Sequence, residues 1–270
     1  MNTVEREMVR VLQDLKQNHH VSGVKAEFEA EGTRMEEAMR LKEVVMAAGL
    51  DLTIKIGGCE AIRDMYEARV LGVERIVAPM IETAFALTKF IKAIELAFPE
   101  DEKRHMDFAV NVETITGTRN FAEMLAAPGV ERIGEVVIGR VDMTGSMGLG
   151  RDDINTDAIF NIAKDICAKA KAKGLKTVIG GGVSAHSLPF FRNLPKGHLD
   201  RYETRKVIFS CPGALSDDAE KGILKAVYFE LLWLKNKRDF YGLIYTEDEN
   251  RINMLEDRYK KTMEKLGIVG

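Results

Sequence analysis

Two kinds of apolar pattern alternate along the chain at a regular interval. Short apolar runs predict strands buried on both faces, and longer segments with apolar residues three and four positions apart predict amphipathic helices. The predicted strands cover residues 23–29, 52–56, 75–79, 107–113, 135–139, 177–179 and 205–209. The predicted helices cover residues 4–16, 33–48, 60–71, 82–97, 117–127, 156–173, a short segment near Leu188, 216–237 and 247–266.

Some helix ends carry local signals. Thr33 with Glu36, and Thr246 with Glu249, have the spacing of a capping box, in which each side chain bonds the backbone N–H of the other residue. Gly49 follows the first of these helices and suits the left-handed conformation common at a helix C-terminus. The second signal predicts that the last helical stretch is divided into two helices near residue 246.

The strict alternation of strands and helices predicts parallel strand pairing. Seven to eight strand–helix units in about 250 residues favour a closed α/β barrel of the TIM (β/α)8 type over an open sheet. Seven strands are clear, so either the barrel is incomplete at its start or one strand escapes the pattern. We expect one domain over residues 1–270, with an N-terminal helix in 1–20, the barrel core in 22–211 and C-terminal helices in 214–266.

Composition narrows the class of protein. The 270 residues include 39 Lys and Arg against 42 Asp and Glu, a formal net charge of −3, which argues against nucleic acid or a membrane surface as a partner. The three cysteines, Cys59, Cys167 and Cys211, are too widely spaced for a disulfide framework or a structural zinc site. With no signal-peptide pattern and no apolar run of about 18 residues, a cytoplasmic protein is expected.

The predicted chemistry lies at the carboxyl ends of the strands, where barrels of this type have their active sites. Glu27, Glu29, Glu113 and Asp142 all end strands, and Lys55 is a cation among them. So many carboxylates at one rim repel each other unless a cation binds between them, and oxygen ligands suit Mg²⁺ or Mn²⁺. Taken singly, each carboxylate is more often a helix cap or an ion-pair partner, and Lys55 could point outward between helices.

Two further features lie on the same side. Gly180, Gly181 and Gly182 follow a predicted strand and could cradle a phosphate through backbone N–H groups, although a tight turn is the more common role of such a run. His186 follows these glycines and is the histidine that is best placed to act as a catalytic group.

Five stretches match, in order, the motifs of a known family. Asn111-Val112-Glu113-Thr114 and the segment from Gly139 to Gly148 resemble the paired signatures of the HpcH/HpaI aldolase and citrate-lyase β-subunit superfamily, and Glu113 and Asp142 lie 29 residues apart as that pattern requires. The other three matching stretches are 77–84, 54–56 and 26–29. Together the matches span residues 24 to 150.

This resemblance implies a barrel that binds a divalent cation, Mg²⁺ or Mn²⁺, and a 2-oxo acid such as pyruvate. It implies that Glu113 and Asp142 are the metal ligands and that the metal stabilises an enolate when a carbon–carbon bond breaks. Lys55 takes the place of a family arginine at the carbonyl or enolate oxygen, and Asn111 that of a glutamine. Backbone N–H groups of Val141 and Asp142 would receive the substrate carboxylate.

By the same resemblance Glu27 and Glu29 form an outer shell that orients the cation. Three departures from the family pattern stand out. Lys55 keeps the charge of the arginine but loses its bidentate fork. Arg140 replaces a proline and adds a second cation for the substrate, and Ala30 stands where pyruvate aldolases carry a catalytic histidine.

The missing histidine leaves the general base open between Glu31, His186 and a metal-bound water. The first reading is a metal-dependent carbon–carbon lyase, or aldolase, acting on a small 2-oxo acid. Two alternatives remain: a transferase or hydrolase using phosphoenolpyruvate or an acyl-CoA, with Arg140 and the glycines meeting phosphate, and a non-catalytic paralogue that has lost the base. Retention of Glu113, Asp142 and Lys55 argues against the paralogue.

The resemblance also implies a homo-oligomer, a trimer or a hexamer. An apolar face of the C-terminal helical region is compatible with an interface between subunits and equally with ordinary packing. Its residues are Ile223, Val227, Leu231, Leu232 and Leu234.

Overall fold

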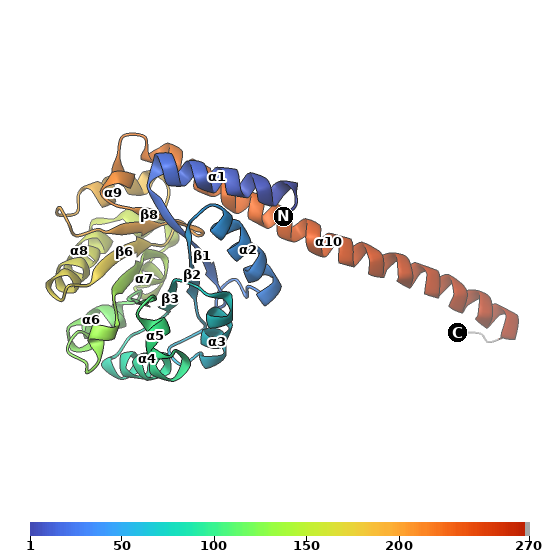
Figure 1. Ribbon diagram of the computed structural model, residues 1–270, viewed down its shortest axis with the longest axis horizontal. Helices are drawn as coiled ribbons and strands as arrows, with labels where there is room; N and C mark the ends of the chain where they lie inside the picture. The colour runs from blue at the N-terminus through green and yellow to red at the C-terminus, as the bar shows by residue number, and fades with distance from the viewer. Residues whose placement is uncertain (268–270) are drawn as a thin grey trace. The chain divides into compact units, whose positions relative to one another are not determined.

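The computed structural model describes residues 1–267, and its strands form a closed barrel (Figure 1). The chain contains two compact units, Met1–Glu230 and the part from Leu231 onward. Among residues 1–267, no helix is both long enough and apolar enough to cross a bilayer. The eight strands, in order around the barrel, are β1 (Val21–Glu27), β2 (Asp51–Lys55), β3 (Arg75–Ala78), β4 (Asp107–Asn111), β5 (Glu135–Gly139), β6 (Lys176–Gly180), β7 (Arg201–Glu203) and β8 (Val207–Ser210).

The expected barrel of the TIM type is confirmed, with one difference in strand direction. Strands β1 to β7 pair in parallel, but β8 runs antiparallel to both β7 and β1. A tight hairpin joins β7 to β8 without a helix: Thr204 N–H donates to the Val207 carbonyl at 2.9 Å, and Val207 N–H donates to Thr204 Oγ1 at 3.1 Å. The prediction of parallel pairing throughout is therefore wrong at the last strand.

The strand that escaped the sequence pattern is β7, and the barrel is complete. Its three residues, Arg201, Tyr202 and Glu203, are too few to show a period and include only one apolar side chain. The first strand, β1, is present and closes the barrel by pairing with both β2 and β8.

Helices surround the strands within the Met1–Glu230 unit (Figure 1). The helix α1 begins with a capping box in which Asn2 Oδ1 accepts from the N–H of Glu5 at 2.9 Å. The helices are α1 (Thr3–His19), α2 (Met35–Ala47), α3 (Ile62–Leu71), α4 (Ala84–Ala97), α5 (Glu100–Lys103), α6 (Ile115–Met124), α7 (Arg140–Ser146), α8 (Asp157–Ala172), α9 (Leu188–Arg192) and α10 (Ala219–Leu266), with short 3₁₀ segments η1 (Val130–Arg132), η2 (Arg151–Asn155), η3 (Ala185–Ser187) and η4 (Gly213–Leu215).

One continuous helix of 48 residues, α10, takes the place of the two C-terminal helices that the sequence predicts. Thr246 lies in its interior, where its hydroxyl donates to the Gly242 carbonyl at 2.8 Å and caps nothing. The spacing of a capping box is therefore not sufficient to start a helix when the preceding turn is already helical.

At the amino ends of the strands, two layers of side chains fill the barrel interior: a network of ion pairs and, next to it, an apolar layer. Arg75 Nη2 lies 3.1 Å from Asp107 Oδ2, Arg75 Nε lies 3.4 Å from Glu135 Oε1, and Arg201 also pairs with Glu135. Above this buried network packs an apolar layer of Val77, Ala109, Val137 and Val178. These two layers fill the barrel at the amino ends of its strands, so its open end is at the carboxyl ends.

Candidate active site

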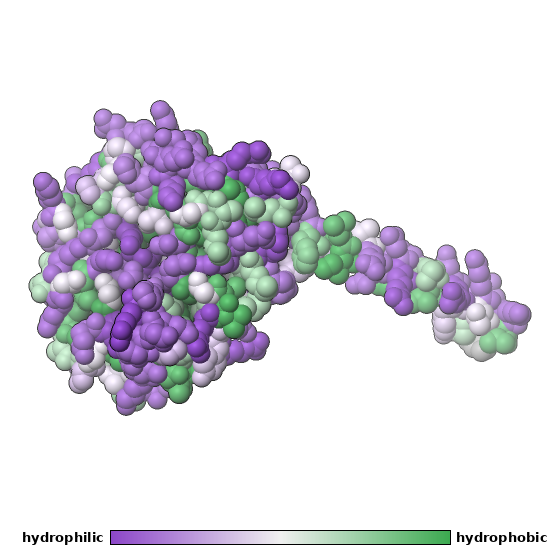
Figure 2. Space-filling view, viewed as in Figure 1, coloured by the Kyte–Doolittle hydropathy of each residue, from purple (hydrophilic) through white to green (hydrophobic). Residues whose placement is uncertain are grey.

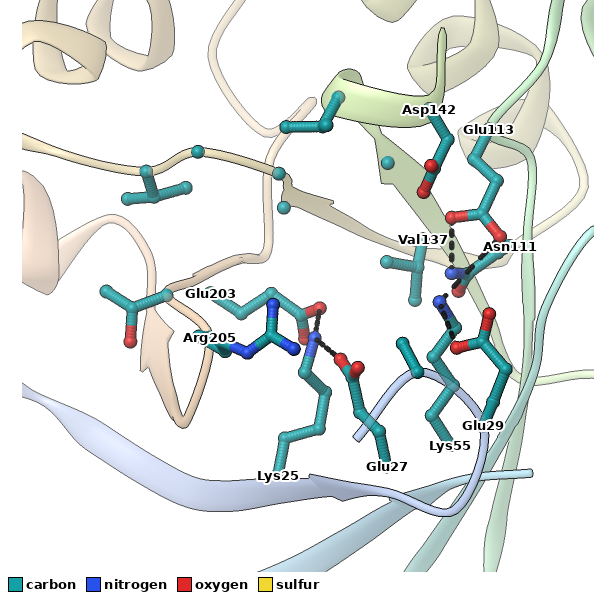
Figure 3. Close-up of a pocket in the computed structure, with 18 of the residues that line it drawn as sticks. Lys25, Glu27, Glu29, Lys55, Asn111, Glu113, Val137, Asp142, Glu203 and Arg205 are labelled. Atoms are coloured by element: carbon teal, nitrogen blue, oxygen red, sulfur yellow. Dashed lines mark hydrogen bonds and ion pairs between the residues drawn. The ribbon is translucent and has the colours of Figure 1, made fainter. Parts of the chain in front are cut away.

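A polar cavity of about 410 Å³ opens at the carboxyl ends of the barrel strands. It is lined by residues of β1, β2, β4, β5 and β7, of the glycine turn after β6, and of α7 and α10. Figure 3 shows the charged side chains that the strands contribute. Its charged and amide residues are Lys25, Glu27, Glu29, Lys55, Asn111, Glu113, Asp142, Arg151, Glu203, Arg205 and Glu230. Four sequence-predicted acids, Lys55 and Asn111 therefore share one cavity.

One half of the cavity is organised around the buried carboxylate of Glu113. Asn111 Nδ2 donates to Glu113 Oε2 at 2.8 Å, and Met80 N–H donates to Glu113 Oε1 at 3.0 Å. Lys55 Nζ lies 3.9 Å from Glu113 Oε1 and 3.1 Å from Glu29 Oε2 (Figure 3). The carboxylate of Glu113 is therefore held from two sides, with the lysine close by.

Gly139 fixes the position of Glu113 by having no side chain. A Cβ at Gly139 would lie 2.5 Å from Glu113 Oε2 and 2.9 Å from Glu113 Cβ. The backbone angles of Gly139, φ −89° and ψ 97°, are open to any residue. Close approach of the Glu113 side chain, and not backbone conformation, is therefore what requires glycine at the end of β5.

Electrostatics in this half keep the lysine charged and make the carboxylate harder to ionise. Burial raises the pKa of Glu113, and the charge of Asp142 adds to this, while Lys55 and Asn111 oppose it. Burial alone would lower the pKa of Lys55, but the carboxylates of Glu113, Glu27 and Glu29 outweigh it and raise that pKa. A further positive charge beside Glu113 and Asp142 would lower the cost of keeping both ionised.

The other half of the cavity contains an ion cluster that sequence reasoning missed. Lys25 Nζ lies 2.6 Å from Glu203 Oε1 and 3.3 Å from Glu27 Oε1, and Arg205 lies beside them (Figure 3). Burial disfavours the charge of Lys25, but the two carboxylates outweigh it and raise its pKa. Lys25 and Glu27 are two positions apart on β1, a spacing that puts both on one face and could have revealed Lys25. Glu203 had no such signal, because its strand was not recognised.

The structure does not bring Glu31 to the cavity. Its carboxylate pairs with Arg205, at 3.1 Å from Nε, and with the buried amine of Lys206. Glu31 therefore neutralises two cations of the β7–β8 hairpin and does not point into the cavity. Ala30, at the position of the family histidine, does line the cavity.

Arg140 and His186 also lie outside the cavity lining. The Arg140 guanidinium is fully buried, donating to the carbonyls of Gly180 at 3.1 Å and Gly181 at 2.9 Å and to Asn155 Oδ1 at 2.6 Å. Burial lowers its pKa to about 10. Arg140 therefore stabilises the glycine turn through hydrogen bonds and does not face the cavity. His186 is exposed in η3.

The donor set is compatible with a divalent cation. No group of three or more His, Cys, Asp or Glu side chains within residues 1–267 is arranged as a metal site. Mg²⁺, however, keeps several waters and needs only one or two protein carboxylates, and Glu113 and Asp142 supply two. Asn111 Oδ1 is buried beside them without a hydrogen-bond partner in the described chain, an oxygen left for a water or a substrate group.

A family model for HpcH/HpaI aldolase/citrate lyase matches residues 36–184, which is more than half of the chain. The chain belongs to this family. Lys55, Asn111, Glu113 and Asp142 lie inside the matched region, whereas the Lys25 cluster draws on strands outside it.

Solved structures agree with the fold. An HpcH/HpaI aldolase/citrate lyase family protein from Burkholderia cenocepacia superposes with a TM-score of 0.58 at 15% identity, covering 74% of this chain and 83% of its own. A variant of the citrate synthase SbnG gives a TM-score of 0.55 at 13% identity, covering 85% of this chain and 90% of its own. A search of curated proteins found no match. At such identities the structures establish the barrel alone.

Proposed function

We propose that this protein is a carbon–carbon lyase that uses Mg²⁺ or Mn²⁺ and acts on a 2-oxo acid of the pyruvate or oxaloacetate type through an enolate. The observation that carries this proposal is the arrangement around Glu113, in which two carboxylates, a protonated lysine and a buried amide oxygen without a hydrogen-bond partner converge at one point of the cavity. Membership of a family of aldolases and citrate lyases supports the class of reaction.

Glu113 and Asp142 would hold the metal, which when bound would supply the positive charge that stabilises an enolate. The charge balance of the cavity favours this assignment. Its lining contains six carboxylates and four cationic side chains, a formal charge of −2 that one divalent cation offsets. The outer carboxylates, Glu27 and Glu29, would orient the cation and its waters.

Lys55 is proposed to bind the oxygen of the 2-oxo group, with Asn111 beside it. A protonated amine next to a developing enolate oxygen stabilises the transition state more than the ground state, which is what accelerates the reaction. The carboxylate of the substrate would be received at the start of α7, by the backbone of Val141 and Asp142. A Cβ on Gly181 would lie 2.7 Å from the Val141 nitrogen, so only glycine allows the turn to approach the start of α7 this closely.

The proton acceptor is proposed to be Glu29. Glu31 is paired with two cations and His186 is exposed, and neither residue lines the cavity. Glu29 lines the cavity, precedes Ala30, and contacts the same Lys55 amine that is proposed to hold the substrate.

The alternative in which Arg140 receives a phosphate is not favoured, because its guanidinium is buried and bonded to the glycine turn. A non-catalytic role remains the outcome to be distinguished by experiment. We also propose that the protein works as a homo-oligomer, and the apolar surface of α10 supports this.

Exchange of the pyruvate methyl protons tests the proposal without knowledge of the second substrate. In D₂O with Mg²⁺ or Mn²⁺, the protein should erase the methyl signal in the proton NMR spectrum, and Asp142→Asn should abolish both the exchange and the binding of Mn²⁺. Asp152→Asn, an exposed carboxylate outside the lining, is the matched control. Binding of Mn²⁺ without exchange of the methyl protons would reject the proposal of a lyase. Absence of both Mn²⁺ binding and proton exchange would favour the non-catalytic paralogue.

A further inference from the structure

The outer part of α10 exposes an unusual amount of apolar surface. Over residues 231–266, exposed large apolar side chains follow one another at intervals of no more than about two turns, and they appear as apolar patches on the surface of the helix (Figure 2). The exposed fractions include 44% for Leu231, 53% for Leu234, 67% for Tyr245, 48% for Ile252 and 47% for Leu255, and Phe240, Leu243, Ile244 and Met254 are exposed beside them. A long apolar stripe of this kind marks a contact surface.

The stripe has the spacing of a coiled coil. Alternating steps of three and four residues from Leu231 to Leu266 define eleven positions, and eight of these are apolar. This is the spacing of the a and d positions of a heptad repeat. The a positions are Leu231, Arg238, Tyr245, Ile252, Tyr259 and Leu266, and the d positions are Leu234, Tyr241, Asp248, Leu255 and Thr262. The charged members, Arg238 and Asp248, decide which partner the seam accepts.

The charges fit a second copy of the same helix that runs in the opposite direction. In an antiparallel pair each a residue faces a d residue, and a two-fold axis at residue 243 sets Arg238 opposite the partner's Asp248 and Asp248 opposite the partner's Arg238. The same register sets Leu231 opposite the partner's Leu255 and Leu234 opposite the partner's Ile252. Every charged core residue then meets an opposite charge, and these leucines meet apolar residues.

The flanking positions agree with this register at most places. Lys235 lies beside the partner's Glu249, and Gly242 and Ile244 each lie beside their own copies at the axis, where a glycine allows close approach. One pair, Lys237 and the partner's Arg251, has like charges. A parallel pair in register is worse, because it places Arg238 against Arg238 and Asp248 against Asp248 in the core.

We propose that residues 231–255 of α10 pair with the same segment of a second chain as an antiparallel coiled coil about a two-fold axis at residue 243. The overlap is about 36 Å long at the rise of an α-helix. In the single chain Arg238 bonds its neighbour Asp239 at 2.7 Å, at a side chain that is 73% exposed. An exposed local pair of this kind contributes little to stability, so little is lost when Arg238 leaves Asp239 for the partner's Asp248.

Charge reversal in the full-length protein tests the register. Asp248→Arg should raise the dissociation constant of the dimer at least about tenfold, because both core pairs become Arg against Arg. Arg238→Asp should act in the same way, and the double variant Arg238→Asp with Asp248→Arg should restore the dimer. Asp257→Arg, the same change at an outward f position, is the control. The measurement is mass by light scattering across a dilution series, against the chain mass of 30.2 kDa.

Cross-linking at the axis gives an independent measure. Gly242→Cys should be linked to its own copy by a short bis-maleimide, and Asn250→Cys, which faces outward, should not. Association that survives both single reversals, or failure of the double variant to restore it, overturns the register. Equal cross-linking of the two cysteines overturns the seam and would indicate that another surface, such as the partner's barrel, covers the stripe.

Discussion

The close contact between Gly139 and Glu113 allows the position of the proposed metal ligand to be tested without changing any polar group. In Gly139→Ala the new Cβ would lie 2.5 Å from Glu113 Oε2, and ordinary contact begins at 3.4 Å, so the carboxylate must move by roughly 1 Å. Misplacement by this amount can cost about 100-fold in rate, or about 2.7 kcal/mol of transition-state stabilisation. Crowding of the core should also lower the free energy of unfolding by about 1–3 kcal/mol.

The assay is the metal-dependent exchange of pyruvate protons, measured together with Mn²⁺ affinity and thermal stability. Gly134→Ala is the matched control, because it lies just before the other end of β5 and the nearest atom to its new Cβ, Asp107 Oδ1, is 3.8 Å away. We expect Gly134→Ala to keep both activity and metal affinity. Wild-type exchange and Mn²⁺ affinity in a folded Gly139→Ala protein would refute the assignment of Glu113 as a ligand.

Three further predictions concern single side chains. Lys55→Met should lower kcat for exchange by about 100-fold or more, and Lys55→Arg should retain most of it, since the charge is kept; equal losses in both would show that the amine is not needed as a cation. Glu29→Gln should lower kcat, whereas Glu31→Gln should lower stability with kcat unchanged, and the reverse result would move the base to Glu31. The Lys171 ion pair and the Thr177 N–H outweigh burial and lower the pKa of Asp200 below 3.8. Its contribution to stability is therefore present above pH 3.8 and lost as pH falls through the folded-state pKa, so the free energy of unfolding of Asp200→Asn should lie below that of wild type near pH 6, and the difference should shrink as pH is lowered below 3.8.

The barrel could be predicted because its regular units repeat a strong local pattern. Buried strands such as β3 and β6 contain consecutive apolar residues, Ile76 to Ala78 and Val178 to Ile179, and long helices such as α8 keep their apolar spacing over more than ten residues. The exception, β7, is stabilised by position and not by local preference: Tyr202 is buried against Phe191 and Phe209 and donates to the Ala214 carbonyl at 2.9 Å. Such contacts join residues of different elements, so no period within β7 indicates them.

Sequence reasoning correctly predicted the cavity residues that lie at the ends of regular strands. It failed for a charged residue at the same edge whose role is structural. Glu113, Asp142 and Lys55 end regular strands or begin the next turn, so the rule for barrels placed them in one cavity. Arg140 has the same sequence context, yet its guanidinium lies over the rings of Phe190 and Phe191, 5.0 and 5.1 Å from their centroids. Which way a long side chain turns depends on packing partners that only the fold reveals.

The two lysines of the cavity also bear on the type of chemistry. A Schiff base with a 2-oxo acid needs a neutral amine, but carboxylates raise the pKa of both Lys25 and Lys55 and keep them protonated. Lys206, whose pKa burial lowers, is outside the lining and pairs with Glu31. The protonated lysines favour the proposed stabilisation of an enolate by charge over the formation of an imine. Borohydride added with pyruvate should leave the mass of the protein unchanged, and a pyruvate adduct on Lys25 or Lys55 would contradict this.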